Sequence, residues 1–233
     1  GADILLNGFG DANEIEFTRA ELQRQFGVKV RYSGADMSQP EQVRAMAQMA
    51  QAEFGKVDIV VNNAGIQHVA PIEEFPEQKW DAVLAINLSS AFHLIKAVTP
   101  GMKARRFGRI INVASAHGLT ASPFKSAYVA AKHGLIGLSK TVAIELAEFR
   151  VTSNTICPGY VKTPLVEKQI ADQAKAHGIS PEQVVRDVML SHQARKEFIQ
   201  VEELAALAVF LASDSAASMT GTALAMDGGW TLH

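Results

Sequence analysis

Short apolar runs alternate with longer amphipathic stretches along the whole chain, and no other feature of the sequence constrains its fold as strongly. The run 57–61 reads Val-Asp-Ile-Val-Val, which is too short and too β-branched for a helix, so we interpret it as a buried strand. In the stretch 39–54, by contrast, Val43, Met46 and Ala50 recur at helical spacing. Such alternation predicts βαβ units and a mostly parallel sheet with helices on both faces, which is a doubly wound, three-layer α/β/α fold.

The chain contains no internal repeat and no low-complexity linker, so we expect a single domain over residues 1–233. We expect strands at 4–6, 28–32, 57–61, 109–113, 155–157 and 223–226, and helices at 13–26, 39–54, 79–96, 127–149 and 201–212. Residues 163–200 differ because they are polar and rich in Gln, Glu, Lys and Ala. They form either a plain pair of surface helices or a lid over a ligand, since they follow Pro158-Gly159 at the end of a predicted strand.

The composition argues against several classes of function. With 22 Lys and Arg against 24 Asp and Glu the net charge is −2, so binding to nucleic acid has little electrostatic support. We find no signal peptide and expect no apolar run to span a bilayer. The single cysteine, Cys157, excludes an internal disulfide, fits a reducing compartment and is best interpreted as a buried small hydrophobe. We therefore expect a cytoplasmic protein with no nucleic-acid, membrane or metal partner.

Small and polar residues follow the predicted strands, at the sheet edge where ligands of parallel sheets bind. Asn62-Asn63-Ala64-Gly65 follows the run 57–61, although this sequence alone is more often a structural turn. Asn87 lies inside a helical stretch, where Asn is a mediocre helix former, so it either holds a water molecule or bends the helix. Ser115 follows the strand expected at 109–113. These clusters indicate a ligand crevice at one end of the sheet.

Tyr128 and Lys132 are four residues apart and so project from the same face of a predicted helix. The plain interpretation is a lysine that extends past a packed tyrosine toward solvent. The chemical interpretation is that a neighbouring ammonium lowers the phenol pKa from its usual value of about 10 and makes Tyr128 a usable base near neutrality. Ser115 would then hold a substrate oxygen while a hydride leaves carbon.

Taken together, Asn62-Asn63-Ala64-Gly65, Asn87, Ser115, Tyr128-x-x-x-Lys132 and Pro158-Gly159 resemble the short-chain dehydrogenase/reductase family along essentially the whole chain. The resemblance implies a Rossmann-type dinucleotide-binding and catalytic domain. It implies a catalytic tetrad of Asn87, Ser115, Tyr128 and Lys132, in which Tyr128 is the acid/base, Lys132 lowers its pKa and holds the nicotinamide ribose, Ser115 orients the substrate oxygen, and the backbone at Asn87 anchors a water chain. It implies cofactor contacts at Phe9, Asp36, Met37, Asn63, Ala64, Gly65, Tyr128, Lys132, Pro158, Gly159, Val161 and Thr163.

The chain departs from the family pattern at its beginning. The family opens with a strand and a Thr-Gly-x-x-x-Gly-x-Gly loop whose amides hold the cofactor pyrophosphate, whereas Gly8-Phe9-Gly10 follows what resembles the second strand. We therefore expect that about 25 to 30 residues, including a central strand, precede the printed sequence. Without that strand, the neighbouring strands would have unpaired edges and part of the core would be uncovered.

The segment 7–11 contains no Arg or Lys that could bind a 2′-phosphate, so the sequence favours NAD over NADP. Asp11, however, lies further past the end of the strand than the acidic residue that usually contacts the ribose. For the substrate, Gln67, His117, Lys125 and Gln169 place a cation, a possible cation and two amides near Tyr128, which suits a small carboxylate. Each residue also has an ordinary interpretation: Lys125 as a solvated lysine, for example, and His117 as a loop residue that caps a carbonyl.

Longer strings, such as Lys-Ser-Ala-Tyr-Val-Ala-Ala-Lys-His-Gly and the closing Asp-Gly-Gly-Trp, resemble bacterial family members that oxidise D-3-hydroxybutyrate. This resemblance implies reversible, NAD-dependent oxidation of D-3-hydroxybutyrate to acetoacetate, a step of ketone-body metabolism, by a homotetramer. It implies substrate contacts at Gln67, Ser115, His117, Lys125, Tyr128, Gln169 and Trp230. The alternatives are a 3-oxoacyl carrier-protein reductase, a sugar-alcohol dehydrogenase, or a catalytically inactive, truncated family member.

Overall fold

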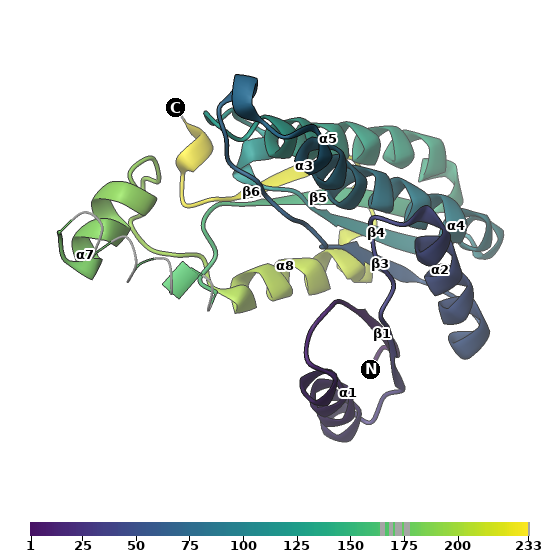
Figure 1. The fold of residues 1–233 in the computed structure, drawn as a ribbon. Helices are drawn as coiled ribbons and strands as arrows, with labels where there is room; N and C mark the ends of the chain where they lie inside the picture. The colour runs from purple at the N-terminus through teal and green to yellow at the C-terminus, as the bar shows by residue number, and fades with distance from the viewer. Residues whose placement is uncertain (164–165, 168–169, 171–173, 175–177, 233) are drawn as a thin grey trace.

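The computed structural model describes residues 1–163, 166–167, 170, 174 and 178–232 and has a three-layer α/β/α architecture (Figure 1). Its strands are β1 (Ile4–Asn7), β2 (Val30–Ser33), β3 (Ile59–Asn62), β4 (Gly108–Val113), β5 (Val151–Pro158) and β6 (Ala223–Met226). Its helices are α1 (Ala12–Phe26), α2 (Pro40–Phe54), α3 (Glu77–Leu84), α4 (Ser90–Arg105), α5 (Ser126–Leu146), α7 (Pro181–Gln183) and α8 (Val201–Ala212). Helices α3, α4 and α5 lie on one face of the sheet and α8 on the other. The predicted doubly wound α/β class is thereby confirmed.

The strands form two parallel sheets. One has the order β3-β4-β5-β6, and the other pairs β1 with β2. Asn62 lies opposite Asn112 in the β3–β4 register, and their side chains are joined by a hydrogen bond of 2.8 Å. All of these strands point the same way, so their carboxyl ends, and the loops that carry the polar clusters, lie at one edge.

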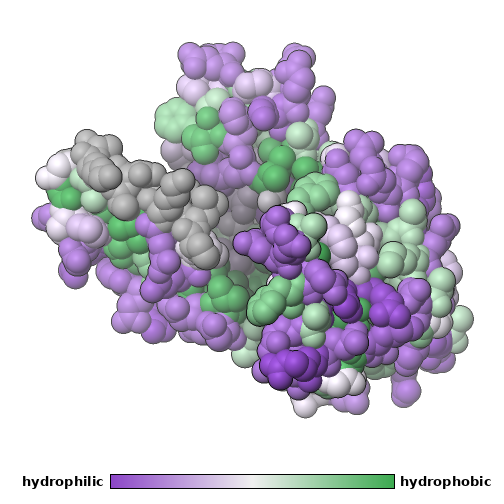
Figure 2. Space-filling view, turned by 60° about the horizontal axis from the view of Figure 1, so that its bottom comes forward, coloured by the Kyte–Doolittle hydropathy of each residue, from purple (hydrophilic) through white to green (hydrophobic). Residues whose placement is uncertain are grey.

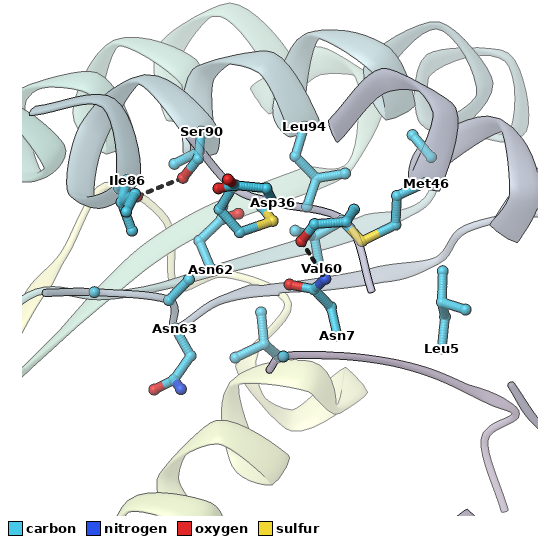
Figure 3. Close-up of a pocket in the computed structure, with 18 of the residues that line it drawn as sticks. Leu5, Asn7, Asp36, Met46, Val60, Asn62, Asn63, Ile86, Ser90 and Leu94 are labelled. Carbon is cyan, nitrogen blue, oxygen red and sulfur yellow. Dashed lines mark hydrogen bonds between the residues drawn. The ribbon is translucent and has the colours of Figure 1, made fainter. Parts of the chain in front are cut away.

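The two sheets are separated between β1 and β3. A cavity of about 550 Å³ occupies the gap. Figure 3 shows its lining, with Leu5 and Val60 coming from the two facing strands and Met46 and Leu94 from α2 and α4. Figure 2 shows apolar side chains gathered around a hollow on the face it presents. On β3, Val61 is 49% exposed, which is unusual for a valine in a strand of this kind of sheet.

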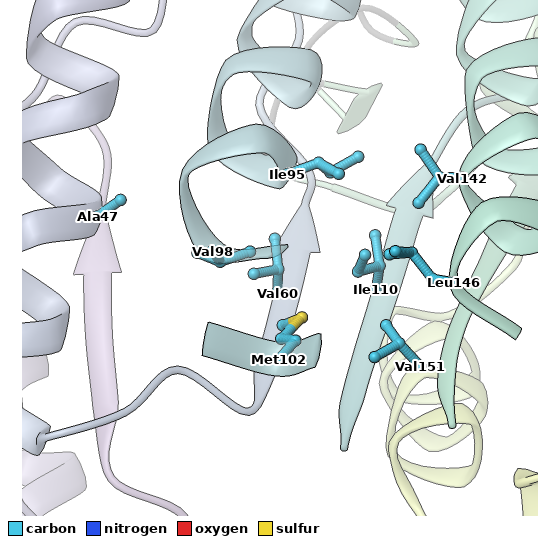
Figure 4. Packing of buried hydrophobic residues seen from close by; sticks show 9 residues of the cluster. All are labelled: Ala47, Val60, Ile95, Val98, Met102, Ile110, Val142, Leu146 and Val151. Carbon is cyan, nitrogen blue, oxygen red and sulfur yellow. The ribbon is translucent and has the colours of Figure 1, made fainter. Parts of the chain in front are cut away.

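The main core lies between the four-stranded sheet and helices α4 and α5 (Figure 4). Ile110 of β4 and Met102 of α4 are fully buried there, and Val142 and Leu146 of α5 pack on them. Every residue of β5 is buried, which explains why its sequence does not alternate between apolar and polar residues. This well-packed half of the molecule supports the loops at the carboxyl ends of β4 and β5.

The predicted helix 79–96 lies within a longer helical stretch, Glu77–Arg105, in which a π-helical turn, η2 (Ala85–Ser89), joins α3 to α4. The expectation that no stretch is long and apolar enough to cross a membrane is wrong, because Glu77–Arg105 meets that test by length and composition. Within it Ile95 and Met102 are buried in the core, and a core helix passes the same test.

Candidate active site

Tyr128 and Lys132 lie in the first two turns of α5 and meet the loop that follows β4. That loop forms a short 3₁₀ turn, η3 (Ala116–Gly118), which Ser115 caps by accepting a hydrogen bond from the backbone N–H of His117 at 3.1 Å. Gly118 allows η3 to pack directly on α5, because a Cβ there would lie 3.0 Å from the Lys132 carbonyl oxygen. The structure therefore brings Ser115, Tyr128 and Lys132 together, as the sequence predicts.

Burial controls the protonation of this group. Lys132 is 3% exposed, and burial lowers its pKa from 10.5 to about 8. Its ammonium lies 5.5 Å from the centre of the Tyr128 ring and donates a hydrogen bond to the Val113 carbonyl at 2.8 Å. Burial raises the pKa of Tyr128, and the Ser115 hydroxyl lowers it by less. This differs from the expectation of a lowered phenol pKa, because desolvation outweighs the favourable contacts.

Asn87 lies in the π-helical turn η2 and holds the loop that follows β3. Its side-chain amide donates to the Ile66 carbonyl at 2.8 Å, and its oxygen accepts from the Ile66 N–H at 2.8 Å. A π-helical turn widens the helix locally and is frequent at functional sites, and here it contains Asn87. The side chain thus fixes the backbone beyond Asn62-Asn63-Ala64-Gly65.

The cavity between the sheets opens at the residues predicted to bind the cofactor. Phe9, Asp36, Met37, Asn63, Ala64, Gly65 and Asn87 line it. The Asp36 carboxylate accepts from the Ser38 N–H at 2.8 Å, and this contact lowers its pKa. Asp11 does not reach this cavity, since it caps α1 by accepting from the N–H groups of Asn13 and Glu14.

The remaining predicted cofactor residues follow β5. Pro158 ends the strand, and the Gly159 N–H donates to the Met226 carbonyl at 3.0 Å. Val161 forms an isolated bridge with Ile199, and the Thr163 hydroxyl accepts from the Val166 N–H at 3.4 Å. These residues border the active-site loops but do not line the cavity between the sheets.

Three of the predicted substrate residues are gathered beside Tyr128. The ring centre of His117 lies 6.1 Å from that of Tyr128 and 5.2 Å from that of Trp230. Burial, and then the nearby Lys125 ammonium, lower the pKa of His117 to about 4, so its imidazole is neutral at pH 7. The buried Nε2 of His117 has no hydrogen-bond partner among the described residues. Burial also lowers the pKa of Lys125.

Gln67 and Gln169 complete the predicted substrate set. Gln67 is exposed on the loop after β3, one residue beyond the Ile66 backbone that Asn87 holds. Gln169 lies outside the described residues.

Two aromatic residues near the site escaped the sequence-based prediction. Tyr160 and His192 both stack on Trp230, with ring centres 5.4 and 6.2 Å away. Asp227 fixes the backbone beside Trp230 by accepting from the N–H and the hydroxyl of Thr231 at 2.9 and 2.6 Å. The position of Tyr160 directly after Pro158-Gly159 could have indicated its role, whereas nothing in the sequence near His192 pairs it with a residue 38 positions later.

Part of the predicted lid at 163–200 lies within the described residues. Helix α7 continues into a π-helical turn, η5 (Val184–Met189), where Val184 is fully buried. Val184, Met189 and Leu190 form a small core of their own, against which Tyr160 packs. Since Tyr160 also stacks on Trp230, this segment is connected to the catalytic group through aromatic contacts. Whether it closes over a substrate stays a prediction.

Comparison with known proteins gives consistent matches along the chain. A family model described as enoyl-(acyl carrier protein) reductase matches residues 1–231. The chain is 57% identical to a D-beta-hydroxybutyrate dehydrogenase of Rhizobium meliloti and 53% identical to one of Cupriavidus necator, in each case over 100% of this chain and 90% of the relative. The L-sorbose reductase of Gluconobacter frateurii, solved with NADPH and L-sorbose, superposes with a TM-score of 0.93 at 32% identity, covering 100% of this chain and 88% of that one.

Proposed function

Because this chain belongs to the short-chain dehydrogenase/reductase family of oxidoreductases, we propose that it catalyses the NAD-dependent interconversion of D-3-hydroxybutyrate and acetoacetate. The observation that carries the substrate assignment is the pair of Lys125 and His117 beside Tyr128. The Lys125 ammonium is close enough to His117 to depress the imidazole pKa, and the His117 ring centre lies 6.1 Å from that of Tyr128, so a cation and a neutral hydrogen-bond donor lie near the group proposed as acid/base. Such a pair suits a small substrate with a carboxylate near its reacting carbon.

The residues present fit a nicotinamide cofactor. A Cβ on Gly65 would lie 3.5 Å from the Asn87 oxygen and 3.6 Å from the Lys132 nitrogen, so the glycine keeps a cradle open between the cavity and the catalytic group. Lys132 would hold the ribose next to the nicotinamide, and Asp36 with Met37 would border the adenine. When bound, the cofactor supplies the acceptor for the hydride that leaves the substrate carbon.

The side chains of this chain handle the proton and the orientation. Ser115 donates to the substrate oxygen, and Tyr128, as the phenolate, accepts the hydroxyl proton at its oxygen during oxidation. With a pKa of about 8, Lys132 remains largely protonated at neutral pH, and its ammonium favours the phenolate. In the reverse direction the raised pKa of Tyr128 suits a proton donor to the carbonyl oxygen. Gln67, Lys125 and His117 bind the carboxylate, with Gln169 and Trp230 completing the substrate site.

We propose that the active form is a homotetramer in the cytoplasm. Ile144 on α5 is 80% exposed and Val209 on α8 is 70% exposed, and both would be covered if long helices and C-terminal segments paired between copies.

The test follows NADH absorbance with purified protein, NAD and each enantiomer of 3-hydroxybutyrate. We expect reduction with the D enantiomer and NAD, and little with the L enantiomer or with NADP. Tyr128→Phe should lower kcat by about 10²- to 10⁴-fold while NADH binding, followed by nucleotide fluorescence, is kept. A preference for NADPH with a 3-oxoacyl thioester would favour the carrier-protein reductase alternative. Retained turnover in Tyr128→Phe would refute the acid/base assignment.

A further inference from the structure

Phe124 adopts a backbone conformation that a phenylalanine rarely takes. Its φ is +64°, in the left-handed region, and its side chain is 55% exposed. Pro123 and Phe124 form a turn just before α5. In a type II turn, Pro commonly occupies the first central position and the second requires a positive φ, where glycine is usual. Phe124 therefore occupies a glycine position, and its exposed ring gives no packing reason for this.

The other non-glycine residues with positive φ in the described part of the chain have an ordinary explanation. Arg106 and Arg150, with φ of +54° and +59°, each end a helical segment in the left-handed conformation that commonly terminates helices. Phe124 instead precedes a helix. Strained backbone that is not part of a helix cap is concentrated at functional sites. The contacts of Phe124 therefore indicate what its conformation is for.

The contact is a single main-chain hydrogen bond between two loops of the active site. The Phe124 carbonyl accepts from the Ala70 N–H at 3.0 Å. Ala70 lies three residues after Gln67, on the loop that Asn87 holds at Ile66, and Phe124 directly precedes Lys125. The bond therefore joins the loop of one proposed carboxylate ligand to the loop of another, and these loops follow different strands.

We propose that Phe124 is a positioning residue: its left-handed backbone directs its carbonyl to Ala70 and so fixes the spacing between Gln67 and Lys125. The connection between the loops stands on the geometry alone, and its effect on substrate binding rests on the proposed function. Because the carboxylate must be bound from both loops at once, loosening the connection weakens binding of the acid and leaves the cofactor site, at Asp36 and Gly65, unaffected.

The test compares substitutions that differ in their tolerance of positive φ. Phe124→Gly adopts the left-handed conformation freely, whereas a β-branched residue such as Val strongly resists it. We expect Phe124→Val to raise KM for D-3-hydroxybutyrate by about tenfold, the loss of roughly one charge-assisted hydrogen bond. KM for NAD should stay within about twofold of the parent. Phe124→Gly should keep parental values. Arg150→Val, which imposes the same backbone conflict at the opposite end of the sheet, should leave both KM values unchanged.

Hydrogen exchange at Ala70, measured by mass spectrometry on peptides that span it, tests the connection without enzyme activity. Exchange should accelerate in Phe124→Val and remain parental in Phe124→Gly and Arg150→Val. Parental exchange and KM in Phe124→Val would overturn the proposal. Equal rises of KM in the Val and Gly variants would overturn it too, because the side chain and not the backbone would then matter. If no hydroxy acid is oxidised while Ala70 exchange follows the expected pattern, the proposed function fails and the loop connection stands.

Discussion

The burial of Lys132 costs folding stability but keeps an ammonium beside Tyr128. A lysine that is 3% exposed must be desolvated, and its hydrogen bond to the Val113 carbonyl and the nearby Tyr128 ring compensate for part of that cost. The cost appears as the lowered pKa of about 8. At neutral pH the ammonium is nevertheless kept next to Tyr128, where the proposed reaction requires a cation.

This trade predicts a pH-dependent stability difference between the parent and Lys132→Met. The unfolded lysine has a pKa near 10.5 and the folded one about 8, so between these values the unfolded chain binds more protons. Stability due to Lys132 therefore rises with pH across that window and is lowest below pH 8. The free energy of unfolding of the parent, minus that of Lys132→Met, should increase by up to about 3 kcal/mol as the pH rises through this window. Urea unfolding at several pH values measures this, and a constant difference would contradict it.

The proximity of Ser115, Tyr128 and Lys132 was predictable because their spacing along the chain is fixed by local structure. Tyr128 and Lys132 share a helix face, and Ser115 follows a strand that the sequence shows clearly. The direction of the Tyr128 pKa shift was not predictable, because desolvation depends on packing from several elements. His192 was missed for a related reason: its stacking on Trp230 arises only when two distant turns come together.

At the scale of elements, the contact between η3 and α5 sets the positions of Ser115, Tyr128 and Lys132 relative to one another. Gly118 is buried in this contact, and an added Cβ would lie 2.9 Å from Ile136 Cδ1 and 3.0 Å from the Lys132 carbonyl oxygen. The Ile136 side chain could turn away from the added Cβ, but the α5 backbone at Lys132 cannot move without moving Tyr128. Substitution at Gly118 therefore affects the site through the separation of two elements.

We expect Gly118→Ala to destabilise the protein by about 1–3 kcal/mol through overpacking and to lower kcat, since Ser115 and Tyr128 would move apart. Gly137→Ala is the matched control. Gly137 lies in α5, the helix on which Gly118 packs, and no atom of the described residues lies within 4 Å of an added Cβ there. There alanine should stabilise by about 0.5–1 kcal/mol and leave kcat unchanged. Thermal unfolding and initial rates measure both variants. A Gly118→Ala protein with parental kcat would show that this contact does not position the catalytic group.

The elements themselves were largely predictable, since periods of two and 3.6 are local properties of the sequence. Helix α8 and strand β6 begin and end where the sequence predicts. The π-helical turn η2 was not predicted, because its apolar residues keep a helical pattern through Asn87 and the change to i→i+5 main-chain hydrogen bonds leaves no mark in that pattern. The N-terminal half of β5 was missed because Thr152-Ser153-Asn154 is polar in sequence although it is buried.

At the scale of the whole molecule, the separation of the two sheets divides the fold into parts of unequal packing. Strand β5 is buried throughout, whereas α1 has no buried residue, and its Phe17 and Phe26 are 71% and 58% exposed. Regions with little buried apolar surface open at lower free energy than the core. In a chain of residues 1–233, the part formed by β1, α1 and β2 should therefore open before the four-stranded sheet does.

Native-state hydrogen exchange tests this division and its link to the cofactor. Amides of β1, α1 and β2 should exchange faster than those of β4 and β5. The first group exchanges when its own part of the fold opens, whereas the second exchanges only when the whole protein unfolds. Phe9 and Asp36 follow β1 and β2 and line the cavity, so a ligand bound there stabilises the closed part by mass action, about 2.7 kcal/mol at 100 times its dissociation constant. Saturating NADH should therefore slow exchange in β1 and β2 by about 100-fold while β5 changes less. Uniform exchange across both sheets, with or without NADH, would show that they unfold as one unit.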